Sequence, residues 1–137
     1  MKRKSKPSVS WELDPEIERR AKNLIKALDL EWVSYGRIFY YRSINSKAHA
    51  YARAWGLPKL WQRTLGVEPA YIVEVISEHF DKLSTKEQDK VLLHELTHIP
   101  RNFSGALVAH TRHKKGSFHD KLDLLIEQYH ANNSTSR

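Results

Sequence analysis

The chain of 137 residues contains no cysteine. Disulfide bonds and thiolate metal ligands are therefore excluded, and any metal ion must be held by imidazole and carboxylate groups. Apolar runs are short as well, because none approaches the roughly 18 residues that a membrane-spanning helix needs. The basic start of the chain also lacks the apolar stretch of a signal peptide. We therefore expect a soluble, cytoplasmic protein with no membrane partner.

Acidic residues are fewer than basic ones, and the formal net charge is +7. Such an excess bears on partners and solubility, not on the fold. Positive residues crowd the first ten positions, which we expect to form a disordered tail, and they recur in the loop 101–116. Both segments could contact nucleic acid non-specifically. The basic residues concerned are Lys2, Arg3, Lys4, Lys6, Arg101, Arg112, Lys114 and Lys115.

The length suits one ordinary domain with a single core. We expect this domain over residues 11–130, with a frayed polar tail at 131–137. Asp14 and Pro15 are typical of the start of a helix, and the apolar spacing that follows predicts a helix over 15–29. A last helix is predicted from a cap at Ser117, with its apolar face formed by Phe118, Leu122, Leu125, Ile126 and Tyr129.

Strand signals lie between these two helices. Aromatic and β-branched residues predict a strand over 32–42, and alternation of small and large residues predicts a second strand over 48–55, paired with the first. Residues 70–76 give the strongest strand pattern, and we expect them at the sheet edge, where an extended peptide could pair with them. The elements predict an α+β fold with a small, mainly antiparallel sheet of about three strands.

A further helix is predicted over residues 85–98. Ser84 and Glu87 have the spacing of a capping box, in which each side chain satisfies an amide at the helix start. Pro100 disfavours helical backbone at the preceding residue, so the helix should end close to His98.

The end of this helix carries the pattern His-Glu-x-x-His, at His94, Glu95 and His98. Residues four positions apart lie on one face of a helix, which suits two imidazoles closing on one ion. Glu95 lies between them, where its carboxylate can reach a water on that ion without being a ligand. A surface helix that carries two histidines by chance is the alternative explanation.

A catalytic zinc ion usually has three protein ligands and one open position. The third ligand must come from downstream, after the turn that Pro100 imposes. His110 and His113 in the loop 101–116 are the leading candidates, and their spacing does not separate them. His119, Asp120 and Glu127 are further donors in the same part of the chain.

Several stretches resemble phage-type metallopeptidases related to the SprT-like zinc proteases. These are the motif itself with its continuation through Pro100, the segment 103–107, and His113 followed by Phe118. The resemblance covers roughly residues 32–127 and implies a minimal zincin-like fold. It also implies that His113 is the third ligand, with His110 as the alternative. The cysteine-rich zinc ribbon of SprT-like repair proteases is missing, so a role in repairing DNA–protein crosslinks is not implied.

Together these features predict a zinc-dependent metallopeptidase. Zinc would lower the pKa of a bound water, and Glu95 would act as the general base that takes its proton before attack on a peptide carbonyl. The expected partner is a peptide or protein substrate. The alternative is a basic nucleic-acid-binding protein with a structural or vacant metal site, in which strand aromatics stack on bases. A regulatory interaction module with a decayed site is a third possibility.

Overall fold

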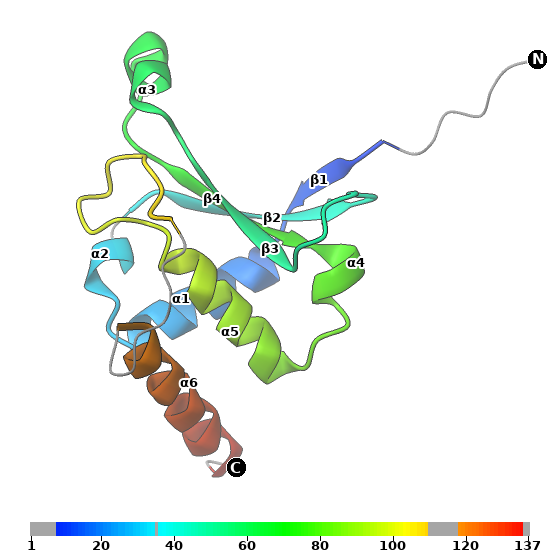
Figure 1. The fold of residues 1–137 in the computed structure, drawn as a ribbon. Coiled ribbons are helices and arrows are strands. Elements are labelled where there is room, and N and C mark those ends of the chain that lie inside the picture. The colour runs from blue at the N-terminus through cyan, green and yellow to red at the C-terminus, as the bar shows by residue number, and fades with distance from the viewer. Residues whose placement is uncertain (1–7, 35, 110–117, 136–137) are drawn as a thin grey trace, which may run out of the picture.

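The computed structural model describes residues 8–34, 36–109 and 118–135. It shows an α+β fold in which one small sheet has helices gathered on one of its faces (Figure 1). The predicted fold class is confirmed, with four strands in place of about three. The strands are β1 (Ser10–Leu13), β2 (Ile38–Ile44), β3 (Ala52–Gly56) and β4 (Tyr71–Ile76), in the spatial order β1-β2-β4-β3.

Strand β4 lies between β2 and β3 and joins them into a mixed sheet. It pairs parallel with β2 and antiparallel with β3, while β1 pairs antiparallel with β2. Two predictions are therefore wrong: residues 48–55 do not pair with the strand before them, and residues 70–76 are central. The near-continuous burial of β4 fits this place, because helices cover one face of the strand and side chains of β3, Arg53 and Trp55, cover Glu74 on the other. Strand β3 forms the edge instead.

Six helices are assigned in the described part of the chain. The helix predicted at 15–29 is confirmed as α1, and its cap is confirmed as well, because the Asp14 carboxylate accepts hydrogen bonds from the backbone N–H groups of Glu16 and Ile17. The helices are α1 (Pro15–Ala27), α2 (Glu31–Ser34), α3 (Lys59–Leu65), α4 (Ser77–Phe80), α5 (Thr85–Leu96) and α6 (Phe118–Thr135).

Local composition misled the strand predictions at two places. Trp32 and Val33 were expected to begin a strand, but they lie in α2, and β2 begins only at Ile38. Strand β1 was not expected, because its four residues are exposed and their pattern is too short to stand out. At the other end of the chain, α6 continues to Thr135, where the sequence suggested a polar tail.

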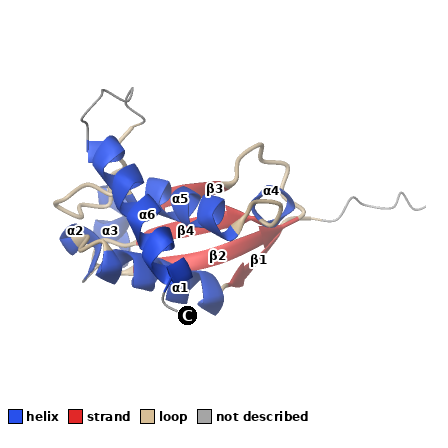
Figure 2. Cartoon of the chain, turned by 90° about the horizontal axis from the view of Figure 1, so that it is seen from below, coloured by secondary structure: helices blue, strands red, loops and turns tan. Residues whose placement is uncertain are grey.

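The core lies between the sheet and the helices that cover it, and Figure 2 shows α1, α5 and α6 on the same side of the strands. Leu122 and Ile126 of α6 are buried as predicted, whereas Leu125 is 38% exposed and does not belong to that apolar face. No helix in the described residues has both the length and the apolar character needed to cross a membrane. The central buried residues are Ile17, Ala21, Leu24, Tyr71, Val73, Val75, Phe80, Leu92 and Leu96.

Candidate metal centre

Helix α5 carries the His-Glu-x-x-His pattern, and its start is fixed locally. The Ser84 hydroxyl accepts from the backbone N–H of Glu87, and the Glu87 carboxylate accepts from the backbone N–H of Ser84, so the predicted capping box is confirmed. The buried Leu92 and Leu96 anchor the helix to the core. The helix ends at Leu96, two residues earlier than expected, and His98 follows in a tight turn.

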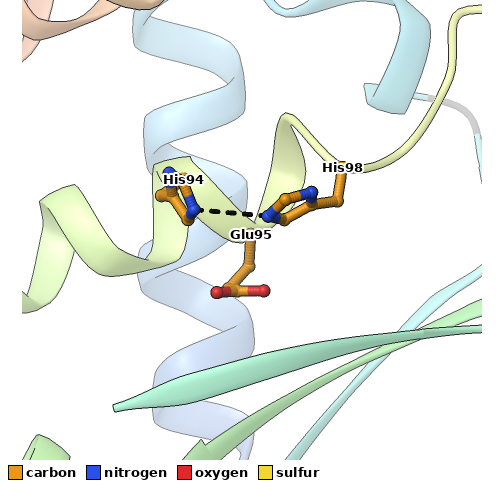
Figure 3. Close-up of side chains that lie close together, drawn as sticks. All are labelled: His94, Glu95 and His98. Atoms are coloured by element: carbon orange, nitrogen blue, oxygen red, sulfur yellow. Dashed lines mark hydrogen bonds between the residues drawn. The ribbon is translucent and has the colours of Figure 1, made fainter. Parts of the chain in front are cut away.

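The two imidazoles of the pattern face each other across the end of α5 (Figure 3). The Nε2 atoms of His94 and His98 lie 3.2 Å apart, and the ring planes are nearly perpendicular at 86°. Two nitrogens bound to one tetrahedral zinc at roughly 2.0–2.1 Å would lie about 3.3 Å from each other. The observed separation, at which the two rings also hydrogen-bond to each other, is therefore close to that of two ligands of one ion.

A backbone carbonyl fixes the orientation of one of these rings. The Nδ1 atom of His98 lies 2.7 Å from the carbonyl oxygen of Val108, and the backbone N–H of Val108 donates to the carbonyl of His98 at 2.7 Å. A carbonyl can only accept, so Nδ1 carries the proton and Nε2 is left with its lone pair. Metal-binding histidines typically have such an outer partner, which holds the ring and sets the tautomer.

Glu95 lies between the two histidines in sequence but points away from them toward the sheet (Figure 3). Its side chain is nearly buried, and the residue is 8% exposed. Burial raises the pKa of its carboxyl to about 7, although a hydrogen bond from the backbone of Ala54 on β3 acts in the opposite direction. A carboxyl that titrates near neutral pH can both accept and return a proton, which is what a general base and acid must do.

Glu95 and His98 border a hollow of about 440 Å³ between β3 and the segment after α5. Most of the described residues that line it are small or apolar, and the lining residues with polar side chains are Arg53, Glu95 and His98. Such a concave site with few polar groups is typical of a ligand or substrate cleft. Its lining consists of Ala50, Ala52, Arg53, Ala54, Glu95, His98, Leu107, Val108 and Ala109.

The segment that forms the far wall of this cleft is tied to the sheet. The Tyr71 hydroxyl accepts from the backbone N–H of Gly105 at 2.8 Å and donates to the carbonyl of Ala106 at 2.7 Å. The Gln62 side chain donates to the carbonyl of Ser104 at 2.9 Å. Gly105 has a φ of 98°, and a Cβ there would lie 2.2 Å from a neighbouring backbone oxygen, so only glycine fits. These contacts hold Val108 where it can orient His98.

The candidate third ligands are only partly covered by the structure. His110 and His113 lie outside the described residues, as does the side chain of His119. Glu127 is engaged elsewhere, because its carboxylate pairs with Lys86 and Lys90 on α5. Among the described residues, the group that could hold a metal ion is His94, Glu95 and His98, whose ligand atoms all lie within 4.8 Å of one another.

Sequence reasoning did not identify the parts that support this centre. Val108 acts through its backbone, so its side chain gives no signal. Tyr71 looked like an ordinary strand residue, and its role depends on a loop more than thirty positions away. Ala54 on the edge strand touches the site because β3 lies beside α5, which depends on the strand order.

The fold and these side chains define a class of protein, a small α+β domain in which two imidazoles and a buried carboxylate form a group that could hold a metal ion. A family model described as "Putative phage metallopeptidase" matches residues 9–124. The chain therefore belongs to the phage metallopeptidase family, which implies a metal-dependent peptidase acting on peptide bonds. Neither the curated proteins nor the solved structures include a match to this chain.

Proposed function

We propose that the protein is a zinc-dependent metallopeptidase of the His-Glu-x-x-His type. The observation that carries this proposal is the 3.2 Å separation of the two Nε2 atoms, with the Glu95 carboxylate in the same group of possible ligands. Membership of a metallopeptidase family supports a metal-dependent reaction on a peptide. Zinc is preferred because imidazole is one of its usual ligands in catalytic sites.

His94 and His98 would hold the ion, and His113 would complete the set, with His110 as the alternative. A zinc ion held there supplies a Lewis acid that polarises a carbonyl and makes water more acidic. Glu95 then takes a proton from the attacking water and delivers it to the leaving amine. The raised pKa of Glu95 supports both steps, because the carboxyl is close to balance between its two protonation states at neutral pH.

The edge of β3 offers a place for the substrate backbone. The backbone N–H of Ile76 donates to the carbonyl of Tyr51. Hydrogen-bonded pairs alternate along an antiparallel ladder, so the backbone groups of Arg53 and Trp55 also bond to β4. The backbone groups of Ala52 and Ala54 consequently point to the outer edge, beside Glu95. We expect an extended peptide to pair with this edge. The sequence-based idea of β-augmentation is thus kept, but on β3 and not on the central β4.

The metal is tested by its stoichiometry in the purified full-length chain. One zinc per chain is expected by mass spectrometry of the metal content, with loss in His94→Ala and in His98→Ala. His49→Ala is the matched control, because His49 is exposed and outside the ligand group. Comparison of His113→Ala with His110→Ala assigns the third ligand, since only the ligand variant should lose the metal.

The reaction is tested with a broad library of peptides. Cleavage is expected with the parent protein, is expected to stop when a chelator removes the metal, and is expected to return when zinc is added. A chain that binds one zinc through the two histidines but cleaves no peptide would count against the peptidase. That result would favour the alternative of a nucleic-acid-binding protein with a structural metal.

A further inference from the structure

The sheet has a second face, which looks away from the helices, and it is unusually aromatic for a surface. Figure 1 shows α1, α5 and α6 on the opposite side of the strands. Side chains alternate along a strand, so Trp11 of β1, Phe39 and Tyr41 of β2 and Trp55 of β3 project from this second face. Tyr51 lies just before β3 and continues the alternation, because its carbonyl accepts from the backbone N–H of Ile76 in the same ladder. We call Trp11, Phe39, Tyr41, Tyr51 and Trp55 the aromatic face.

These rings are exposed even though a strand aromatic usually belongs to a core. Trp11 is 56% exposed, Tyr51 50%, Trp55 47% and Phe39 41%. Three of the five, Trp11, Tyr41 and Trp55, surround a hollow of about 430 Å³. Its floor is formed by Ile72 and Glu74 of β4. A ring-walled hollow of this size accommodates a flat aromatic group.

The floor of the hollow is already satisfied by internal hydrogen bonds. Glu74 is fully buried, and its carboxylate accepts from the indole N–H groups of Trp11 at 3.2 Å and Trp55 at 2.8 Å. It also accepts two bonds from the Arg53 guanidinium, at 3.1 and 3.2 Å. The indole N–H groups are thus turned down into the sheet. The two indoles therefore present ring surface and not their N–H groups to a ligand. Such a surface suits stacking of nucleic-acid bases without a preference for one base.

The aromatic face carries two arginines, Arg37 and Arg53, and one buried carboxylate, Glu74, which compensates the charge of Arg53. The guanidinium of Arg53 lies 5.0 Å from the ring centre of Trp55, and that of Arg37 lies 5.8 Å from the ring centre of Phe39. The central carboxylate, Glu74, is buried and paired with Arg53. In the sequence, four basic residues lie shortly before Trp11: Lys2, Arg3, Lys4 and Lys6.

From these observations we propose that the aromatic face binds single-stranded nucleic acid, with bases stacked on its rings and phosphates near Arg37. A duplex hides its bases, whereas a single strand can present them to a sheet. The aromatic rings lie across the sheet from α5 and the candidate metal centre, although Arg53 also borders the cleft there.

The test measures binding of the full-length chain to a fluorescein-labelled 15-nucleotide oligothymidine at several salt concentrations. Tyr51→Ala and Phe39→Ala should each weaken binding about tenfold, because one stacked base is lost in each variant. Trp61→Ala is the matched control: Trp61 is 56% exposed on α3, outside the aromatic face, and its loss should leave affinity unchanged. Circular dichroism confirms that each variant is folded.

Three results would overturn the proposal. The first is binding that survives both ring variants but disappears when Lys2, Arg3, Lys4 and Lys6 are replaced by alanine, which would assign it to the tail alone. The second is equal affinity for the same sequence as a duplex. The third is a dimer seen by sedimentation that Tyr51→Ala dissociates. Glu95→Gln should bind the oligonucleotide with the affinity of the parent. Absence of oligonucleotide binding would therefore not count against the peptidase, and absence of peptide cleavage would not count against nucleic-acid binding.

Discussion

Two buried glutamates lie on opposite sides of the sheet, and their surroundings are opposite in kind. Glu74, on the open face, receives four hydrogen bonds from Trp11, Trp55 and Arg53. Burial alone would raise its pKa, but the bonds from Arg53 and Trp55 outweigh burial and hold the pKa below the ordinary value. Glu95, on the helix-covered face, has burial as the dominant influence, and its pKa rises to about 7.

The comparison separates a carboxylate that serves the fold from one that is available for chemistry. Ionisation of Glu74 favours the folded chain because its donors are already in place. Ionisation of Glu95 opposes folding of the metal-free chain, because the charge is buried with little compensation. A carboxyl whose pKa is raised by burial in this way is typical of functional sites.

The largest expected effect is on catalysis. Glu95→Gln should lower peptide cleavage by about 10²–10⁴-fold, because the amide cannot take the proton from water. Zinc content should stay close to that of the parent, since neither histidine changes, and thermal stability should not fall, because the amide removes a buried charge that opposes folding. Kinetics with a cleaved peptide, together with metal analysis, check this. A variant that keeps full activity would remove Glu95 from the mechanism.

Glu74→Gln should leave zinc binding intact but weaken the fold. We expect a loss of about 2 kcal/mol in the free energy of unfolding, because Arg53 and the two indoles lose a charged acceptor while Arg53 can turn partly to solvent. Urea denaturation measures the loss. Glu12→Gln is the control, because Glu12 is exposed on β1 and should change stability by less than about 0.5 kcal/mol.

The stability difference between the parent and Glu74→Gln should itself depend on pH. The folded-state pKa of Glu74 lies below its ordinary value of 4.5, so the carboxylate stabilises the fold above that pH. The contribution should disappear as the pH falls further, through the folded-state pKa. Denaturation curves of the parent and of Glu74→Gln should therefore differ at neutral pH and approach each other as the pH is lowered below 4.5. A constant difference would show that the lost bonds act without the charge.

The smallest effect is expected at the loop that supports His98. Tyr71→Phe removes a hydroxyl that bonds to both Gly105 and Ala106, which should cost about 1–2 kcal/mol of stability. Zinc affinity should fall by up to about tenfold, because Val108 is then held less firmly behind His98. Competition with a chelator measures the affinity. Tyr51→Phe is the control, and an equal loss there would contradict the coupling.

Much of the centre could be predicted because it is local. The capping box at Ser84 and Glu87, the stop imposed by Pro100 and the spacing of His94 and His98 all act within one helix and the turn after it. The order of the strands could not be predicted in this way. Alternation over 48–55 indicated a strand, which the structure confirms only from Ala52 onward, and alternation does not say which neighbour that strand will have.

The sequence by itself determined α1 and α5, the donors on α5 and the absence of thiolates, because caps and helical spacing act between residues close along the chain. The tertiary structure alone decided that β4 lies at the centre and β3 at the edge. It also decided that Ala54 approaches Glu95, that Val108 orients His98, and that Glu74 is surrounded by donors. Each of these depends on contacts between segments far apart in sequence, where side-chain packing and strand pairing select the partners.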